Sequence, residues 1–252
     1  MTGAAPRDPA FATTSRSLLS ARQNVPRSAA AFLAVMAGLV VIKLAVARLA
    51  PQAYVVPAQA QVLAWPVIGA LTIVGLIGVW FASRTGFPET WDPRVPVRHR
   101  LLLPIVTGLI FGAIAMVVDA LTGWTTIAAP YLHHMPFPAS LLIYPGFAVI
   151  GPILDFLVPL PLVMWLAGFV LQGRWTKQAF WVVGAFAAAI EPLTYDLHAA
   201  GHPGIVVAMF AQQYAFNLAQ VATFRRAGFG ASLVLQITFF LAWHVLWGAL
   251  RS

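Results

Sequence analysis

The chain has 252 residues, of which 60% are apolar and only 9% carry a charge. Soluble domains have about a quarter of their residues charged, so this composition excludes an ordinary soluble fold and predicts a protein that lies in a lipid bilayer. The formal net charge is +8, but most basic residues lie in short stretches between apolar runs. This placement argues against nucleic acid as a partner and favours contact with anionic lipid headgroups.

Residues 1–28 are the first predicted unit, a flexible basic tail that contains four arginines among Ser, Thr, Pro and Ala. A cleaved signal peptide would need a short apolar core and a small-residue cleavage site after its basic region. A full-length apolar run, residues 29–49, follows the tail instead. We therefore expect an uncleaved first span and a tail on the cytoplasmic side of a cell inner membrane.

Further apolar runs follow along the chain, and a helix needs about 20 such residues to cross the hydrocarbon core. The runs that fit are 29–49, 62–82, 101–121, 179–195, 205–224 and 230–250. Between them, residues 138–172 are apolar but are interrupted by Pro145, Pro152, Pro159 and Pro161. A straight helix of about 35 residues would measure about 50 Å, whereas the hydrocarbon core is about 30 Å thick. We therefore expect this segment to tilt, break or re-enter.

Basic residues between the runs predict how the spans are oriented, because loops rich in Lys and Arg stay in the cytoplasm. They occur in the tail, in 83–100, and in the pairs Arg174/Lys177 and Arg225/Arg226. The connections that lack Lys and Arg are 50–61, 122–138 and 196–204. This alternation predicts seven spans if 138–172 crosses once, with an eighth crossing as the alternative. Arg251 then lies on the outer side.

The fold class follows from the hydrogen-bonding demand of the backbone in lipid. Only α-helices and closed barrels satisfy every backbone group there. Because the apolar runs are near 20 residues long and lack a period-two alternation, the chain is predicted to be all-α. The expected architecture is a polytopic, multi-pass transmembrane helical bundle over residues 29–251 with one proline-broken span.

Three titratable residues inside predicted spans are singled out as candidates for chemistry: Asp155, Glu191 and His244. A carboxylate at membrane depth costs about 2.5–3.5 kcal/mol on insertion scales, so such residues are functional-site hypotheses by default. A neutral imidazole binds metals or transfers protons. The three groups lie on three separate spans and would form one metal or proton site if they converged inside the bundle. The alternative is structural, with hydrogen-bonded or protonated carboxyls and a packed histidine.

Other polar residues receive structural interpretations. Glu89 and Asp92 lie beside arginines between two spans and are expected to be solvated loop charges. Asp119, near the outer end of the third span, is expected to reach the interface. The sixth span carries three amide residues on one face, which we expect to turn toward protein and to hydrogen-bond across helices. These residues are Gln213, Asn217 and Gln220.

Three stretches of the second half share a pattern with one family of membrane enzymes. Thr85-Gly86-Phe87-Pro88 precedes a basic segment and a Gly-containing span. The stretch ILDFLVPLPLVMW, residues 153–165, has the residue pattern of the helix that bears the first motif of that family. FNLAQVATFRRAGFGASLVLQITFFLAWHVLWG, residues 216–248, places an Arg-x-Gly turn before a helix that bears a histidine. In these features the chain, over about 85–250, resembles the CPBP family, the CAAX-protease, bacteriocin-processing and Abi-like intramembrane metallopeptidases.

The resemblance implies a peptidase in which a glutamate activates a water molecule and histidines hold a metal or stabilise the oxyanion. The family's first motif is Glu-Glu-x-x-x-Arg, and here Gly151-Pro152 stand at the paired glutamates and Phe156 stands at the arginine. The second motif is Phe-x-x-x-His, and here Ile190 stands at the histidine, with Glu191 next. Both motifs therefore lack their functional side chains.

One functional position of the family is kept. His244 matches the histidine of the third motif, His-x-x-x-Asn or Asp, although Gly248 replaces the last residue. Because general base catalysis contributes about 10²–10⁴ to a rate, loss of the base predicts a catalytically degenerate relative, a pseudoenzyme. Such a protein would bind another membrane protein, a peptide or a lipid in addition to the bilayer.

Two alternatives stay open. In the first, an active, divergent metalloendopeptidase uses Glu191, His244 and Asp155 as catalytic residues, with His244 and Glu191 as ligands of a divalent metal such as zinc. In the second, a transporter or proton-coupled carrier uses the broken helix and the buried carboxylates, although no internal repeat is found. No other cofactor is expected.

Overall fold

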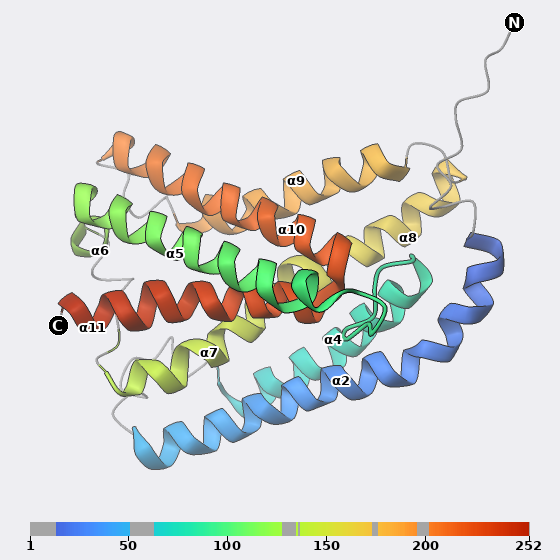
Figure 1. Ribbon diagram of the computed structural model, residues 1–252, viewed down its shortest axis with the longest axis horizontal. Coiled ribbons are helices and arrows are strands. Elements are labelled where there is room, and N and C mark those ends of the chain that lie inside the picture. The colour runs from blue at the N-terminus through green and yellow to red at the C-terminus, as the bar shows by residue number, and fades with distance from the viewer. Residues whose placement is uncertain are drawn as a thin grey trace, which may run out of the picture.

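A computed structural model describes residues 14–50, 63–127, 135, 137–172, 176–195 and 202–251. Every regular element in these ranges is a helix (Figure 1). The α-helices are α2 (Thr14–Leu49), α4 (Trp65–Arg84), α5 (Leu103–Thr122), α6 (Trp124–Ile127), α7 (Ala139–Gly151), α8 (Pro159–Leu171), α9 (Thr176–Tyr195), α10 (Pro203–Phe240) and α11 (Gly248–Arg251). The π-helical segments are η2 (Arg98–Leu102), η3 (Pro152–Leu157) and η5 (Leu241–Trp247). The prediction of an all-α fold is confirmed. α2 begins within the range predicted as tail, and residues 1–13 lie outside the described residues.

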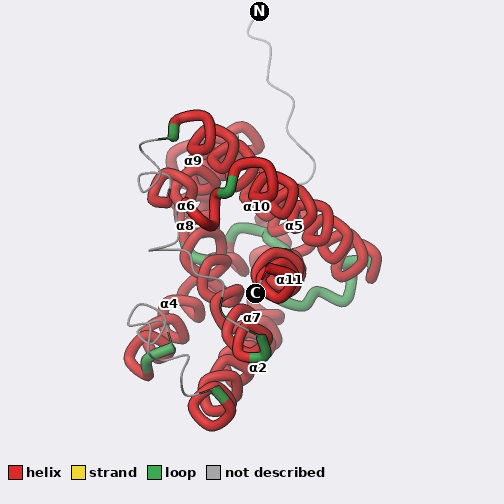
Figure 2. The backbone as a smooth tube through the Cα atoms, turned by 90° about the vertical axis from the view of Figure 1, so that its left-hand side faces the viewer, coloured by secondary structure: helices red, strands yellow, loops and turns green. Residues whose placement is uncertain are grey.

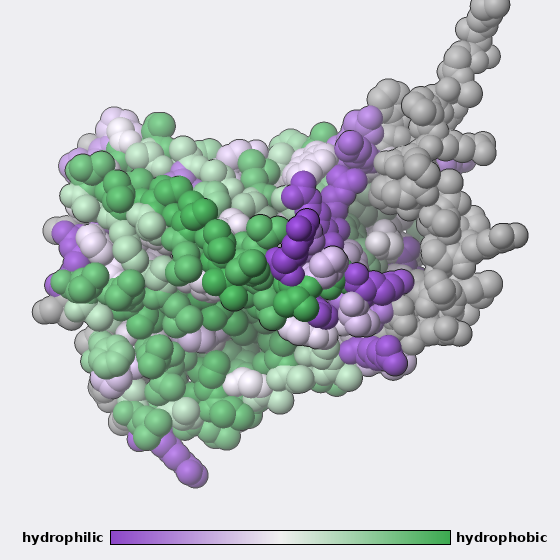
Figure 3. All heavy atoms as spheres, in the orientation of Figure 1, coloured by the Kyte–Doolittle hydropathy of each residue, from purple (hydrophilic) through white to green (hydrophobic). Residues whose placement is uncertain are grey.

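Five helical stretches are long and apolar enough to cross a membrane. They are Val25–Leu49, Trp65–Arg84, Arg98–Thr122, Ala139–Leu171 and Pro203–Arg251. α9 has 20 residues but is not one of the five. Large apolar side chains are exposed on these stretches, as on Val41 at 65% and Val170 at 81%, which suits a lipid environment. On the face shown in Figure 3, hydrophobic residues cover most of the surface and hydrophilic residues gather toward one side.

The proline-rich segment forms one helical stretch, Ala139–Leu171, with a distortion at its centre. Between α7 and α8 the chain winds as η3, and the Val158 N–H donates to the carbonyl of Ile153, five residues back, at 3.1 Å. Pro152 begins η3 and Pro159 begins α8, and neither residue has an N–H to continue the α-helical pattern. The predicted break is therefore a widened helical turn, and Asp155 lies on it.

α10 folds back on itself at Gly228, whose backbone has φ 80° and ψ −177°. Glycine adopts this conformation without the steric penalty that a side chain would bring. Residues 203–227 form the first arm, and the second arm, residues 229–251, continues through η5 and α11 and returns beside it (Figure 1). The two arms are joined by a hydrogen bond between the side chains of Gln220 and Gln236.

The fold-back packs against the connection between α4 and η2, residues 85–97. The Gly230 N–H donates to the Thr90 carbonyl at 3.1 Å, and a Cβ on Gly228 would lie 2.9 Å from the Pro88 carbonyl oxygen. The Thr90 N–H donates in turn to Ser28 Oγ of α2 at 3.2 Å. These contacts join α2, the connection and α10 at one end of the bundle. We call this the basic end, after its residues Arg84, Arg94, Arg98, Arg100, Arg225 and Arg226.

Asp92 and Glu89 are not the solvated charges that the sequence predicted. Asp92 is 4% exposed and accepts hydrogen bonds from the Arg94 N–H at 2.9 Å, Nε at 3.0 Å and Nη2 at 2.8 Å. The Glu89 side chain is 11% exposed and lies 3.9 Å from Arg94 Nη2. The expectation was wrong because the connection folds inward onto α10. The hydrogen bond from the Arg94 side chain lowers the pKa of Asp92 below its ordinary value of 3.8.

Glycines allow a close helix contact between α5 and the second arm of α10. A Cβ on Gly108 would lie 2.7 Å from the Leu235 carbonyl oxygen, and a Cβ on Gly112 would lie 2.5 Å from the Ala242 Cβ. Helices in lipid lack a hydrophobic driving force toward each other, so small residues four positions apart stabilise them by close packing. Figure 2, which looks nearly along the helices, shows α5 beside α10 in the resulting bundle.

Replacement of Gly228 by alanine is expected to destabilise the protein. A backbone at φ 80° and ψ −177° is essentially restricted to glycine and costs a residue with a side chain about 1–3 kcal/mol, and the added Cβ meets the carbonyl oxygens of Pro88 and Glu89. Gly69→Ala on α4, where a Cβ meets nothing within 4 Å, is the matched control and should leave stability unchanged or slightly higher. Thermal unfolding midpoints in detergent measure both changes. An unchanged midpoint for Gly228→Ala would contradict the expectation.

The Asp92–Arg94 pair should make stability sensitive to acid. The folded-state pKa of Asp92 lies below the unfolded value near 3.8, so its stabilisation is complete above that value and is lost as the pH falls through the folded pKa. The effect should be less than about 1 kcal/mol, because the Arg94 side chain is 73% exposed. Unfolding midpoints at about pH 5 and pH 3 should fall further for the wild type than for Asp92→Asn. Parallel profiles would refute this.

Candidate functional site

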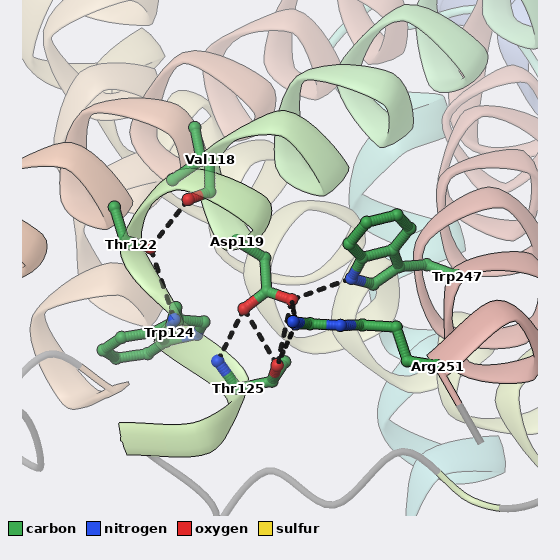
Figure 4. A network of polar contacts seen from close by, with 7 residues as sticks. All are labelled: Val118, Asp119, Thr122, Trp124, Thr125, Trp247 and Arg251. Atoms are coloured by element: carbon green, nitrogen blue, oxygen red, sulfur yellow. Dashed lines mark hydrogen bonds and ion pairs between the residues drawn. The ribbon is translucent and has the colours of Figure 1, made fainter.

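A first polar cluster, drawn in Figure 4, lies at the end of the bundle where α6 and α11 meet, opposite the basic end (Figure 1). Asp119, in the last turn of α5, is 0% exposed. It accepts hydrogen bonds from the Thr125 N–H at 2.7 Å and from Trp247 Nε1 at 2.8 Å, and it pairs with Arg251 Nη1 at 2.5 Å. α6, η5 and α11 cover the Asp119 side chain, so it is buried in protein, and its expected place at the membrane interface stays a prediction. The pair also explains how Arg251 is accommodated at this end.

This first cluster leaves no acceptor open to a ligand. The Thr125 hydroxyl lies 2.8 and 2.9 Å from the two Asp119 oxygens and shares its single hydrogen between them. Oδ1 also accepts from the Thr125 N–H, and Oδ2 also accepts from Trp247 and Arg251. A buried carboxylate that is fully hydrogen-bonded and paired is stabilised in place. We therefore assign the first cluster a structural role, which is to hold α5, α6, η5 and α11 together.

A second polar cluster comprises Asp155, Glu191, Gln213 and Asn217, and we call it the polar centre. It lies where η3, α9 and the first arm of α10 meet. Gln213 Nε2 and Asn217 Nδ2 each donate to Glu191 Oε2 at 3.1 Å. Asp155 lies close enough to Glu191 for the two carboxylates to interact electrostatically. Two of the three titratable residues that the sequence singled out therefore lie on elements that pack against each other, η3 and α9.

Gln220, Ser232 and Gln236 form a polar ladder between the two arms of α10. Gln220 Nε2 donates to Gln236 Oε1, and Ser232 Oγ donates to Gln220 Oε1 at 3.1 Å. The ladder extends toward Asp155, because Asp155 Oδ2 and Gln236 Nε2 lie 3.5 and 3.8 Å from the position of a Cβ on Gly151. A residue with a side chain at position 151 would contact both groups, so glycine leaves room for them.

The amide face of the sixth predicted span is turned toward protein, as expected. Asn217 and Gln220 are each 1% exposed, and Gln213 is half-buried against Glu191. Asn217 Nδ2 also donates to the Ala188 carbonyl at 3.1 Å, which ties the first arm of α10 to α9. Asn217 Oδ1, in contrast, is buried and accepts no hydrogen bond from the described residues.

Asp155 also keeps its acceptors open. Within the described ranges its carboxylate accepts no hydrogen bond and forms no ion pair. The residue is half-buried, and its neighbour Leu154 is 51% exposed. Oxygen acceptors in a low-dielectric interior require a donor, a proton or a cation. The polar centre can therefore bind a group that supplies hydrogen-bond donors or positive charge.

His244 has a different, aromatic environment. Its ring stacks on Tyr144 of α7 with 4.4 Å between centroids and 15° between planes, and it lies 4.7 Å from the ring of Phe240. Among the described residues, no three His, Asp or Glu side chains are grouped so that they could hold a metal ion. The roles of Glu191 and His244 as metal ligands, and of both with Asp155 in catalysis, stay predictions.

Sequence reasoning missed Gly151, Ser232 and Gln236 as neighbours or members of the site. A glutamine within an apolar span was a usable signal, because an amide in hydrocarbon needs a partner. The identity of the partner had no local signal, since Gln236 meets a residue 16 positions away across a helix reversal.

The two clusters should respond in opposite ways to the same change. Asp119→Asn removes one partner of a buried ion pair and places amide hydrogens against donors, so we expect a loss of about 3 kcal/mol in unfolding free energy. Asp155→Asn removes a carboxylate without donors and should leave stability unchanged or higher. Unfolding of both variants in detergent measures the difference. Equal destabilisation by the two substitutions would show that Asp155 is structural.

Comparisons with known proteins do not assign a family or a function to the chain. No family model, no curated protein and no solved structure matches the chain. The resemblance to the CPBP family over about 85–250 therefore stays a prediction that is based on the residues alone. A functional hypothesis has to be built on the polar centre.

Proposed function

We propose that this chain is a multi-pass inner-membrane protein with a CPBP-like core that lacks peptidase chemistry. In this proposal it binds a membrane-spanning segment of another protein at the polar centre. The supporting observation is that two amides of α10 donate to Glu191 on α9, and that η3, which carries Asp155, packs against both helices. His244, the histidine needed for a metal, has aromatic neighbours. Such a site is equipped to recognise a polar group in the bilayer.

The proposal includes seven spans with the N-terminus in the cytoplasm. The five long apolar stretches become seven crossings if α9 crosses and if each arm of α10 crosses once. α9 has 20 residues, which is enough to cross, and Gly228 separates the arms. This arrangement puts the basic end in the cytoplasm, as expected from the distribution of Lys and Arg. The Asp119–Arg251 pair would then lie at the outer face.

Access from the bilayer favours a partner that is itself in the membrane. Glu191 and Asp155 are half-buried, and the apolar residues next to them are exposed. Leu154 is 51% exposed, Ile190 55% and Leu193 58%. Because these apolar neighbours would face lipid, a hydrophobic helix that lies against them would bring its own side chains to the polar centre. Recognition would then resemble the binding of an amphipathic helix to an apolar surface, with both partners in the bilayer.

A proton-coupled carrier is the second candidate function. One observation favours it: Asp155 lies on a widened turn of a proline-broken span and interacts electrostatically with Glu191. Carboxylates on discontinuous helices near the midplane are typical of ion-coupled transporters. An active metallopeptidase is the third candidate, and it would require a metal that binds Glu191 and His244.

A photo-crosslinker at the mouth of the polar centre tests the proposal. We expect p-benzoyl-phenylalanine at position 190 to cross-link a second membrane protein in native membranes, and we expect Asp155→Asn combined with Glu191→Gln to abolish that product. The matched control is position 182 on the same helix, where Val182 is 56% exposed and the product should be lipid.

Cross-links from position 190 to lipid alone would contradict the proposed function. Proton flux into liposomes that contain the purified protein tests the second candidate function, the proton-coupled carrier. Proton flux that is lost in the double variant would replace the binding function by the carrier, whereas flux equal to that of protein-free liposomes would remove the carrier.

A further inference from the structure

An apolar groove lies on the half of α4 that leads to the basic end. It is lined by five side chains of this helix, which are Ile73, Leu76, Ile77, Trp80 and Phe81. Because they recur at intervals of three and four positions, they share one face of α4. Ile73 is 63% exposed and Ile77 is 47% exposed. This face is therefore open to the surroundings of the protein, which in a bilayer are lipid.

The length of the groove matches one leaflet of a membrane. Ile73 and Arg84, the last residue of α4, are 11 positions apart, and a rise of 1.5 Å per residue makes this about 16 Å. One leaflet contributes half of a hydrocarbon core that is about 30 Å thick. A membrane-spanning partner helix would need a face as long as the whole core. The groove therefore fits an acyl chain of the leaflet at the basic end.

Arg84 supplies a positive charge at the end of this groove. Its Cζ lies 4.4 Å from the centroid of the Trp80 ring, so the guanidinium is held over a residue that lines the groove. The ion pairs among the described residues involve Arg94 and Arg251 instead. Within the described ranges, therefore, no carboxylate neutralises Arg84, and an anion from outside the chain would complement its charge.

The N–H donors of Arg84 are not needed to cap the last turn of α4. Ser83 Oγ donates to the Trp80 carbonyl at 2.7 Å, and Thr85 Oγ1 donates to the Phe81 carbonyl at 3.0 Å. These hydroxyl groups satisfy carbonyls that the end of a helix leaves without intrahelical partners. The five N–H donors of the guanidinium are thus available to bind oxygen atoms of a ligand.

Aromatic rings beside the groove indicate its depth in the membrane. α4 packs against α8, and the ring of Trp165 lies 6.3 Å from that of Trp80 and 5.2 Å from that of Phe81. Phe169 extends the cluster, with 4.7 Å between its ring and that of Trp165. Tryptophan is enriched at the level of the lipid headgroups. Arg84, one helical turn beyond Trp80, would then lie at the depth of the lipid phosphates.

We propose that the groove and Arg84 form a binding site for an anionic phospholipid of the leaflet at the basic end. An acyl chain lies along Ile73 and Ile77, and the guanidinium binds the headgroup phosphate through two parallel N–H···O hydrogen bonds. A zwitterionic lipid carries a cation next to its phosphate, which weakens its attraction to a basic surface. The site shares no residue with the polar centre, so this inference is independent of the proposed function.

Phosphatidylglycerol with a diazirine in its acyl chain tests the site. The full chain in detergent is illuminated with this probe, and the labelled peptides are identified by mass spectrometry. We expect the label within residues 73–81. Unlabelled phosphatidylglycerol should compete at least about tenfold better than phosphatidylcholine with the same acyl chains. Arg84→Gln should weaken the binding of phosphatidylglycerol about tenfold, because it removes a charge-assisted contact to the phosphate.

Arg226→Gln is the charge-matched control. Arg226 is an exposed arginine of the basic end on α10, so its replacement removes the same charge and should keep the preference for phosphatidylglycerol. An equal loss of binding in both variants would show a general attraction to net charge and would overturn the inference. Equal competition by the two lipids, or label spread evenly over the apolar stretches, would overturn it as well.

Discussion

Gly228 reverses α10 because its backbone takes φ 80°, and the carbonyl oxygens of residues 88 and 89 lie where a side chain would be. The returning arm carries Gln236 to Gln220 and brings Arg251 to Asp119, which precedes it by 132 positions. It also packs on Gly108 and Gly112 of α5. These contacts of the second arm therefore all depend on the reversal of α10 at Gly228. In lipid, such a reversal must leave no backbone N–H or C=O group without a hydrogen bond.

Two carboxylates within the apolar stretches, Asp119 and Asp155, differ in how their burial is compensated. Asp119 has donors on both oxygens and an arginine partner, so its burial is compensated and its position is structural. Asp155 lies in another such stretch and accepts no hydrogen bond from the described residues. Hydrocarbon offers no water to replace the missing donors. The two carboxylates therefore differ in whether the protein itself satisfies their hydrogen-bonding capacity. This contrast supports a binding role for the polar centre.

The polar centre also bears on the resemblance to the CPBP family. Asp155 follows Gly151-Pro152, the positions of the family's paired glutamates, and Glu191 follows Ile190, the position of its second histidine. If the resemblance holds, the polar centre occupies the place of the peptidase site, with carboxylates and amides instead of a base and metal ligands. A scaffold that keeps such a site would keep the ability to bind a peptide segment in the membrane.

The amino-acid sequence by itself determined the all-α fold class, predicted lipid as the surroundings of the helices, and pointed to part of the candidate site. Long apolar runs require helices in lipid, the prolines of 138–172 require a break, and charges at membrane depth mark Asp155 and Glu191 as residues that need partners. Helical periodicity also placed Asn217 on a protein-facing side, because that pattern is local.

Only the tertiary structure decided which groups meet. It placed Gln236 beside Gln220, covered Asp119 with Trp247 and Arg251, and set His244 against the rings of Tyr144 and Phe240. It also buried Asp92, which the sequence placed in solvent. These outcomes depend on a helix reversal and on the crossing of helices far apart in the chain. Residue patterns report the surroundings of a single helix and contain no information about which second helix lies against it.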